Sequence, residues 1–216
     1  SFYCDVTEYL KAGNNVLAVL LENRPQSSRW YPGAGLYRKV RHITLPKVHV
    51  PVWGTYVTTP YVGEEYANVS VRTKVEGLDS EEAVTLRTRI LDADGNVVAE
   101  SLDTRKVLKG EVEQNLVVPS PQLWSPEDPV LYFAETEVYT GGRVYTEWSK
   151  EHYKKHRTIR EDGFELQDKV STRFGIRTIE NRPDKGFFLN GKLRKFQGVC
   201  LHHDLGPLGA AINTAA

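Results

Sequence analysis

The segment Val69-Ser-Val-Arg-Thr-Lys-Val75 places valine or threonine at every odd position and a polar side chain at every even one. A period of two is typical of a β-strand that has one buried face and one solvated face. The same alternation recurs further along the chain, in Val84–Ile90, Gln114–Val118, Tyr132–Val138 and Phe174–Thr178. The chain is therefore predicted to be mainly β.

Turn signals separate these alternating segments. Asp92-Ala-Asp-Gly-Asn96 contains the Asp-Gly pair that favours a tight hairpin, and Gly141-Gly142 is expected to end the strand that begins at Tyr132. Roughly six or seven short strands over ~130 residues, without a long helix, predict an immunoglobulin-like β-sandwich over residues 47–180. The Cys–Trp–Cys pattern of antibody domains is absent from the sequence.

Residues 1–46 contain shorter pieces of regular structure. Asp5–Glu8 has the spacing of a capping box, so we expect a helical turn that ends at Gly13. Asn15–Glu22 and Arg41–Leu45 are expected to be strands, the first of them covered on both faces. Three such pieces cannot enclose a core, and we interpret them as the last part of a β domain.

Residues 181–216 have a different character. Phe187–Lys192 contains Asn-Gly and predicts a hairpin, and Lys195–Leu201 is a mostly apolar segment typical of a buried parallel strand. His202-His-Asp204 follows that strand and precedes a helix start. Together they make one βα unit, and in a (β/α)8 barrel the carboxyl end of the strand carries the chemistry. Neither end of the chain resembles a natural terminus, so we expect a fragment of a longer protein.

The composition is that of a globular protein and excludes several functions. Of the 216 residues, 40% are hydrophobic and 26% are charged, and 28 basic residues balance 28 acidic ones. A net charge of zero argues against a nucleic-acid partner, which needs an excess of lysine and arginine. The longest apolar run, Val16–Leu21, is far too short to cross a membrane. Two cysteines do not make a disulfide scaffold, and nothing in the composition indicates a compartment.

Five motifs, in this order along the chain, carry a resemblance to a known family. They are Arg29–Arg38 (RWYPGAGLYR), Leu123–Tyr132 (LWSPEDPVLY), Arg173–Arg177 (RFGIR), Gly186–Lys192 (GFFLNGK) and Gly198–Asp204 (GVCLHHD). Together they resemble glycoside hydrolase family 2, and most closely its bacterial β-galactosidases. The resemblance implies the end of a jelly-roll domain in residues 1–46, an immunoglobulin-like β-sandwich in 47–180 and the first βα unit of the catalytic (β/α)8 barrel in 181–216.

The resemblance also implies a reaction. Members of this family hydrolyse terminal β-linked sugars with retention of configuration, using two glutamates whose carboxyl groups lie ~5–5.5 Å apart. Both glutamates belong to later barrel strands, and the acid/base is part of an Asn-Glu pair, which does not occur in this sequence. We therefore expect a fragment of a retaining glycoside hydrolase that carries no catalytic residue and is inactive by itself.

His202 and Asp204 are the candidate substrate-binding residues. The resemblance places His202 where the family lines its sugar pocket, and Asp204 where members carry Asp or His near the sugar hydroxyls. A neutral imidazole can donate and accept a hydrogen bond, and a carboxylate can accept bonds from hydroxyls. His203 either shares that role or packs at the barrel rim. Many galactosidases have Asn-Arg where this chain has Cys200-Leu201, so the finer contacts stay open.

A metal site at the same triplet is the competing interpretation. His and Asp are good ligands, but neighbouring residues of an extended segment point to opposite sides, so no metal ligand is assigned. Arg29 and Trp30 are further candidates for sugar contact, or Trp30 packs at the domain junction. Ser28 stands where some galactosidases have an Asp that helps to hold sodium. No cofactor is expected in the fragment, and Mg or Na in the full-length protein is implied by the resemblance alone.

A rival hypothesis comes from another class, a non-catalytic β-sandwich module that binds carbohydrate or another protein. Such a module needs exposed aromatic side chains for stacking on sugar rings. The basic run Tyr153–Arg160 indicates either an anionic partner or a charged edge strand that blocks sheet pairing, and the zero net charge favours the edge strand. For the full-length protein, the resemblance implies an oligosaccharide substrate, homo-oligomers, and a bacterial cytoplasm or periplasm as its location.

Overall fold

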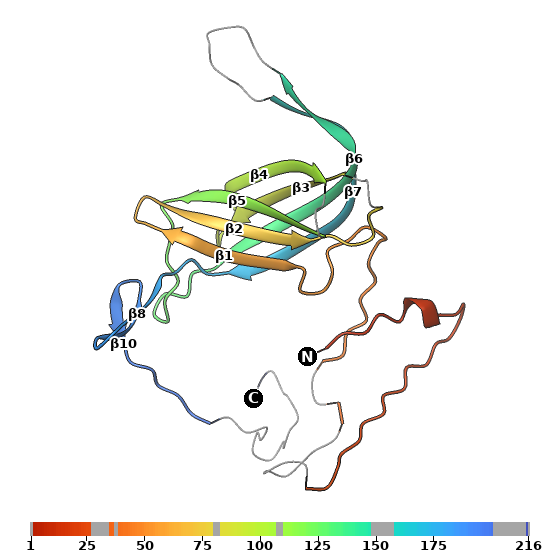
Figure 1. Cartoon of the computed structure of the whole chain (residues 1–216), viewed down its shortest axis with the longest axis horizontal. Coiled ribbons are helices and arrows are strands. Elements are labelled where there is room, and N and C mark those ends of the chain that lie inside the picture. The colour runs from red at the N-terminus through yellow and green to blue at the C-terminus, as the bar shows by residue number, and fades with distance from the viewer. Residues whose placement is uncertain are drawn as a thin grey trace. The chain divides into compact units, whose positions relative to one another are not determined.

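The computed structural model describes residues 2–26, 35–36, 39–79, 83–106, 110–147, 158–200 and 215 of the chain. Its internal contacts divide the chain into two units, one that joins Ser1–Thr44 to Phe196–Ala216 and one that spans Leu45–Lys195. We call the second unit the two-sheet body. All strands of the described residues lie in it, as Figure 1 shows.

Strands follow one another through the two-sheet body with short connections. In chain order, the elements of the described residues are η1 (Thr7–Tyr9), β1 (Thr55–Val62), β2 (Tyr66–Lys74), β3 (Ala83–Leu91), β4 (Val97–Lys106), β5 (Glu111–Pro119), β6 (Tyr132–Glu147), β7 (Thr158–Phe174), β8 (Ile179–Arg182), β9 (Gly186–Leu189) and β10 (Lys192–Arg194). The alternating segments at Val69, Val84, Gln114 and Tyr132 fall in β2, β3, β5 and β6, so these strand predictions are confirmed.

The strands form two larger sheets and one small sheet. All neighbouring strands pair antiparallel, in the orders β1–β2–β5, β4–β3–β6–β7 and β10–β9–β8 (Figure 1). The hairpins β1–β2, β3–β4 and β6–β7 each stay within one sheet, whereas the connections from β2 to β3, from β4 to β5 and from β5 to β6 change sheet. Side chains of both larger sheets share one core, so these two sheets pack face to face.

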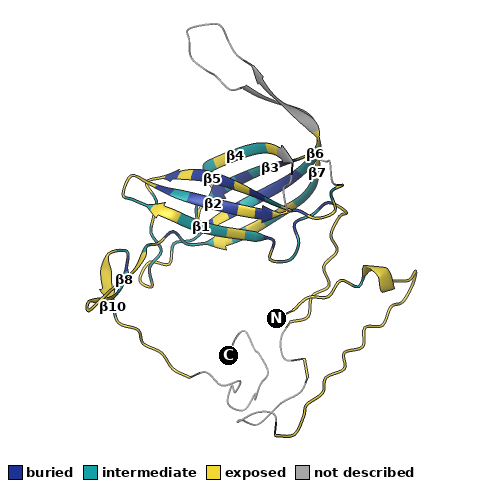
Figure 2. Ribbon diagram, in the orientation of Figure 1, coloured by how far each residue is buried: buried dark blue, intermediate teal, exposed yellow. Residues whose placement is uncertain are grey.

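The alternation within β2 decides which of its faces is buried. Val69 and Val71 point into the core, opposite Leu116 and Gln114 of β5, while Arg72 points outward. The first buried cluster consists of Ala67, Val69, Val71, Ile90, Leu116, Val118, Tyr132, Ala134 and Ile176. Figure 2 shows buried positions alternating with exposed ones along β5, whereas in β2 three consecutive residues, Val69 to Val71, are buried. Because full burial of one such side chain contributes ~1.5–3 kcal/mol, this cluster is a main source of stability.

A polar layer stands between the first cluster and a second one. The second cluster consists of Val48, Val50, Val75, Val84, Leu86, Val112 and Val138. On β3, β5 and β6, one buried polar residue separates the members of the two clusters, namely Thr88, Gln114 and Thr136. The Thr88 hydroxyl donates to Oε1 of Gln114 over 2.6 Å, and Nε2 of Gln114 donates to the Leu86 carbonyl over 3.1 Å. Because buried polar groups require partners, this layer favours one alignment of the two sheets.

The chain enters the two-sheet body through residues 47–50. Val50 donates its backbone N–H to Oδ2 of Asp168 over 2.8 Å, and His49 forms a backbone bridge with Glu76. Gly77 follows with φ +82°, and a Cβ on it would lie 1.7 Å from the Lys47 carbonyl oxygen. Only glycine therefore fits where these two chain segments cross.

Several predictions of strands near or beyond the ends of the two-sheet body are wrong for the residues that the structure describes. Asn15–Glu22, Arg41–Leu45 and the described part of Lys195–Leu201 form no strand, and their apolar side chains are mostly exposed. A strand needs a neighbour to take up its N–H and C=O groups, and no described segment pairs with these three. An apolar run is therefore not sufficient for a strand when no partner strand is aligned with it.

The helical turn expected near the N-terminus is also wrong in its details. Only the single 3₁₀ turn η1 forms, and the chain is extended again at Leu10. Oδ1 of Asp5 accepts hydrogen bonds from the Thr7 amide, over 2.9 Å, and from the Thr7 hydroxyl, over 2.6 Å. The short Asp side chain thus bonds the residue two positions further on, as in an Asx turn, instead of capping Glu8.

Two expected strand ends differ from the structure. β6 continues past Gly141, which takes a φ of +68° while the ladder with β7 runs on to Glu147. A glycine with positive φ lets the strand bend without ending it. The strand expected at Phe174–Thr178 is wrong except for its first residue, because β7 ends at Phe174 and residues 175–178 form no strand, although Ile176 is fully buried. Of the basic run, the structure describes only Thr158–Arg160, which belong to β7.

Candidate functional site

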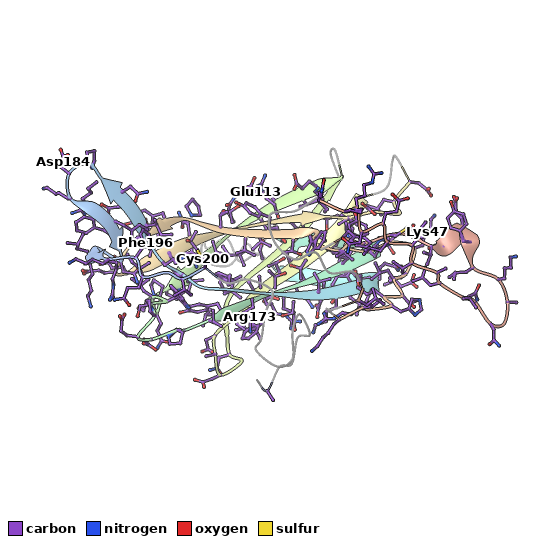
Figure 3. All side chains as sticks on the ribbon, turned by 90° about the horizontal axis from the view of Figure 1, so that it is seen from below. Lys47, Glu113, Arg173, Asp184, Phe196 and Cys200 are labelled. Carbon is purple, nitrogen blue, oxygen red and sulfur yellow. The ribbon has the colours of Figure 1, made fainter. Side chains whose placement is uncertain are left out.

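The five candidate binding residues from the sequence, His202, His203, Asp204, Arg29 and Trp30, lie outside the described residues. Their roles therefore stay predictions. The described residues nevertheless include the segment that leads to His202, which comprises β8, β9, β10 and residues 195–200. Figure 3 labels Asp184 in the β8–β9 turn and, further along the chain, Phe196 and Cys200.

The expected hairpin at Phe187–Lys192 is confirmed as β9 and β10. Asn190 and Gly191 form its turn with φ values of 50° and 72°. Positive φ at both central residues is the geometry that an Asn-Gly pair favours, and it matches the twist of the flanking strands. The turn therefore follows directly from local sequence.

Three chain segments meet at the Asn190 side chain. Its Oδ1 accepts the Thr178 backbone N–H over 2.9 Å, and its Nδ2 donates to the Trp124 carbonyl over 3.0 Å. The backbone adds two further bonds, from Asn190 N to the Thr178 carbonyl and from Trp124 N to the Ile176 carbonyl. The Asn190 side-chain amide thus connects the β9–β10 turn to the loop between β5 and β6, at Trp124, and to the connection after β7, at Thr178. We call this arrangement, together with the ion pair described next, the β9–β10 junction.

An ion pair joins the last strand to the same loop. Arg194 of β10 donates from Nη1 and Nη2 to the two carboxylate oxygens of Glu127, each over 2.6 Å. These hydrogen bonds from Arg194 hold the pKa of Glu127 below its ordinary value. The Arg177 guanidinium also lies over the Trp124 ring, 5.4 Å from its centroid. A paired fork of this kind fixes orientation as well as distance.

A second polar cluster lies on the outward face of the four-stranded sheet. We call it the outer ladder, and its members are Arg87, Arg89, Glu135, Glu137, Tyr139 and Lys169. Arg89 pairs with Glu135 over 2.8 Å, and Lys169 pairs with the same carboxylate over 2.9 Å. The ladder thereby crosses β3, β6 and β7.

Glu137 lies at the centre of the outer ladder. The Tyr139 hydroxyl donates to its Oε2 over 2.7 Å, while Arg89 and Lys169 approach its Oε1 to 2.5 Å and 3.4 Å. Burial by itself would raise the pKa of Glu137, but the Tyr139 hydrogen bond and the two cations outweigh it and lower the pKa. The general acid of a glycosidase needs a raised pKa, so this environment favours structural ion pairing.

The described residues offer no cluster of three or more His, Cys, Asp or Glu side chains that could hold a metal ion. In the same part of the chain, no helix is long and apolar enough to cross a bilayer. Cys4 and Cys200 are both exposed free thiols.

The stacked antiparallel sheets define a mainly β protein, and comparison with known proteins shows its family. The model of the family described as glycosyl hydrolases family 2 matches residues 48–177. The chain belongs to this family. The resemblance carried by the five sequence motifs is thereby confirmed.

Relatives match the chain over nearly its whole length. It is 40% identical to β-galactosidase BoGH2A of Bacteroides ovatus, over 100% of this chain and 24% of the relative. It is 28% identical to a β-glucuronidase of Formosa agariphila, over 91% of this chain and 20% of the relative. The chain thus spans about a quarter or less of the length of these proteins.

Solved structures share the fold of this chain. A crystal structure of a glycosyl hydrolase family 2 member from Bacteroides cellulosilyticus matches with a TM-score of 0.67 at 32% identity, over 87% of this chain and 23% of that one. A β-glucuronidase of Bacteroides uniformis matches with a TM-score of 0.60 at 27% identity, over 78% of this chain and 19% of that one.

Sequence reasoning missed the two polar clusters of the two-sheet body. A signal for the outer ladder exists, because the alternation of β3 and β6 puts Arg87, Arg89, Glu135 and Glu137 on the face opposite the core. No local sequence pattern predicts the β9–β10 junction, because Asn190 and Trp124 are 66 residues apart in the chain and Arg194 and Glu127 are 67 apart.

Proposed function

We propose that this chain is part of a retaining glycoside hydrolase of the β-galactosidase type, which hydrolyses terminal β-linked sugars. The observation that carries this proposal is the 40% identity to a β-galactosidase across the whole chain. β-Glucuronidases also match the chain, at a lower identity of 28%. We therefore assign galactose as the sugar on the basis of the higher identity to the β-galactosidase.

The proposed architecture is an immunoglobulin-like β-sandwich between the end of a jelly-roll domain and the first βα unit of a (β/α)8 barrel. Support for the sandwich comes from the strand orders β1–β2–β5 and β4–β3–β6–β7, with connections that change sheet after β2, β4 and β5. The flanking assignments, residues 1–46 and 181–216, rest on the family resemblance.

In this proposal the chain carries neither catalytic glutamate. The family acid/base belongs to an Asn-Glu pair, and this sequence contains none. Glu137 is also unsuited to catalysis, because its carboxylate is bound by Arg89, Lys169 and Tyr139 and stabilises the four-stranded sheet. The isolated chain is therefore expected to leave a chromogenic β-galactoside intact. Turnover that survives repurification would contradict the proposal.

His202 and Asp204 are proposed to contact the sugar. Both follow an apolar segment whose carboxyl end would face the mouth of a barrel, where sugar hydroxyls and developing oxocarbenium charge lie. An imidazole that bonds a hydroxyl more tightly in the transition state than in the ground state raises kcat.

Substitution in the full-length protein tests this role. His202→Ala is expected to lower kcat on a β-galactoside by ~30–1,000-fold, equivalent to one polar contact of ~2–4 kcal/mol, with an unchanged Tm. The matched control is His42→Ala, because His42 is an exposed histidine of the described residues. Full activity with a lowered Tm would assign His202 a structural role. A parallel assay with a β-glucuronide decides which sugar is hydrolysed.

A second candidate function, carbohydrate binding by the two-sheet body itself, is favoured by one observation. Tyr56, Tyr61 and Tyr66 lie exposed on the outward face of the β1–β2–β5 sheet. The rings of Tyr61 and Tyr66 lie 4.9 Å apart, and the Arg72 guanidinium lies 4.7 Å from the centre of the Tyr56 ring. Exposed aromatic faces beside polar groups suit sugar rings.

Oligosaccharide binding by the isolated chain distinguishes this second function from the first. Saturable binding of a β-galactoside oligosaccharide that Tyr61→Ala and Tyr66→Ala abolish would support a binding module. Retention of binding in both variants, or its absence in the wild-type chain, would rule the module out. The control is Tyr9→Ala, since Tyr9 is an exposed tyrosine outside the two-sheet body.

A further inference from the structure

The turn residues Asn190 and Gly191 form a chemically labile pair, and no other Asn-Gly pair occurs in the sequence. The backbone nitrogen of the residue after an asparagine can attack the side-chain amide, and a glycine leaves that nitrogen unhindered because it has no Cβ. Gly191 is exposed and has open space where a Cβ would lie. Its N–H donates no hydrogen bond among the described contacts, so nothing in them blocks the attacking nitrogen.

The amide that would be attacked is, in contrast, held at both ends. Oδ1 of Asn190 accepts the Thr178 N–H over 2.9 Å, and Nδ2 donates to the Trp124 carbonyl over 3.0 Å. The Asn190 backbone N–H also bonds the Thr178 carbonyl, over 3.0 Å. Because these bonds fix the direction of the side chain, ring closure toward the Gly191 nitrogen requires the β9–β10 junction to open first.

We propose that Asn190 is a deamidation site whose reaction requires opening of the β9–β10 junction and whose products cannot restore it. In the first step the Gly191 nitrogen forms a bond to Cγ of Asn190 and the bond between Cγ and Nδ2 breaks. The amide leaves as ammonia, which takes up the proton of the Gly191 N–H. Water then opens the cyclic imide at either of its two carbonyl carbons. The products are aspartate and isoaspartate, water is the only co-reactant, and nothing is oxidised or reduced.

Both products lack the hydrogen-bond donor that the junction uses. An ionised carboxylate only accepts hydrogen bonds, so aspartate can still accept the Thr178 N–H but leaves the Trp124 carbonyl without its donor. The new negative charge also lies next to that carbonyl oxygen. Isoaspartate lengthens the main chain within a two-residue turn whose φ values of 50° and 72° fit the flanking strands. Deamidation therefore permanently weakens the attachment of the small sheet β10–β9–β8 to the loop at Trp124.

Peptide mass spectrometry of the folded and the urea-unfolded protein tests the site. Both samples are incubated at the same mildly alkaline pH, and peptides that contain Asn96 and Asn181 are internal controls, since neither residue precedes a glycine. Asn190 is expected to deamidate at least ~10-fold more slowly in the folded protein, and to yield isoaspartate as well as aspartate. Equal or faster reaction in the folded protein would overturn the protection, and no reaction at Asn190 in urea would overturn the site.

A variant that loosens the junction without changing the Asn-Gly pair tests the need for opening. Glu127 accepts two hydrogen bonds of 2.6 Å from Arg194, which tie the same loop to the same hairpin. Glu127→Gln is expected to deamidate ~2–5-fold faster than the wild-type protein, because the pair is exposed and contributes modestly. The matched control is Glu180→Gln, since Glu180 pairs with Arg182 inside β8. An unchanged rate in Glu127→Gln, or equal acceleration in both variants, would overturn the coupling to the junction.

The effect of the product is tested with Asn190→Asp, which has the side chain of one deamidation product. Amide exchange of peptides that contain Thr178 or residue 190 is expected to accelerate ~5–10-fold, because the bond to the Trp124 carbonyl is lost. Asn181→Asp is the charge-matched control, since Asn181 lies exposed in β8, and it should leave this exchange unchanged. Wild-type exchange in Asn190→Asp would show that the product keeps the junction closed and would overturn this part of the proposal. The inference does not depend on the proposed function.

Discussion

Strand β2 of the two-sheet body and the segment Val16–Leu21 both contain valines, but these valines are opposite in burial. Val69 in β2 is 0% exposed, whereas Val16 is 93% exposed. Val69 alternates with polar residues and pairs with Leu116 of β5. Val16 belongs to a continuous apolar run that pairs with no described strand.

The difference shows that an apolar segment stabilises the fold only when its backbone hydrogen-bonds to a neighbouring strand. In β2 the ladder satisfies the N–H and C=O groups, and one face of the strand is then free to pack against the opposite sheet. The run at Val16–Leu21 lacks both the ladder and the opposing layer among the described residues. The following predictions test how sharp this contrast is.

Hydrogen exchange of the chain should show the largest contrast. Amides of residues 69–75 are expected to exchange at least ~10³-fold more slowly than those of residues 16–21, because the core strand opens only with global unfolding. Mass spectrometry of the exchanging chain measures both segments in one experiment. Equal protection would mean that Val16–Leu21 is paired in solution and would abolish the contrast.

The entry to the two-sheet body offers the next largest effect. Gly77→Ala is expected to destabilise the chain by ~3–5 kcal/mol, since the new Cβ would meet the Lys47 carbonyl and φ is +82°. The control is Gly95→Ala, because Gly95 has φ +86° with nothing within 4 Å of its Cβ position. It should cost only ~1–2 kcal/mol. Urea denaturation compares the two, and similar losses would exclude the steric explanation.

Matched truncations of two valines compare the regions directly. Val69→Ala removes two buried methyl groups and is expected to cost ~2–3 kcal/mol of unfolding free energy. Val16→Ala changes an exposed side chain and should alter stability by less than ~0.5 kcal/mol. A substantial loss in Val16→Ala, measured by thermal unfolding, would show that the N-terminal segment buries this residue.

The outer ladder is expected to make a smaller, pH-dependent contribution to the free energy of unfolding. The pKa of Glu137 is lowered from 4.5, so its stabilisation is fully present above pH 4.5 and is lost as the pH falls through its folded-state pKa. Glu137→Gln is expected to cost ~1–2 kcal/mol at pH 7 and to reduce the loss of stability below pH 4.5.

Glu100→Gln is the control for the outer ladder. Glu100 pairs with Arg87 but is half exposed, so the stability of this variant should follow the wild-type pH curve. Thermal unfolding between pH 3 and pH 7 provides the measurement. An unaltered acid slope in Glu137→Gln would assign the pH dependence to other carboxylates.

Local periodicity predicted most strands of the two-sheet body, with Phe174–Thr178 as an exception, and it was an unreliable guide outside that body. The alternation at Val69, Val84 and Tyr132 predicted real strands because each of them has a paired neighbour. The Asn-Gly turn at residue 190 was also predictable, since its φ values depend on the two residues themselves. The strand predictions at Asn15–Glu22 and in the described part of Lys195–Leu201 failed because a pattern specifies a face and does not supply a partner strand.

The sequence alone determined that the chain is mainly β, where the core strands alternate, and, through five ordered motifs, the family. These features are local, or depend on residue identity at known spacing. Only the tertiary structure decided that Thr88, Gln114 and Thr136 meet in one polar layer and that Asn190 connects Thr178 to Trp124. Such contacts join residues far apart in the chain, and they form only after the sheets have packed, so no local pattern encodes them.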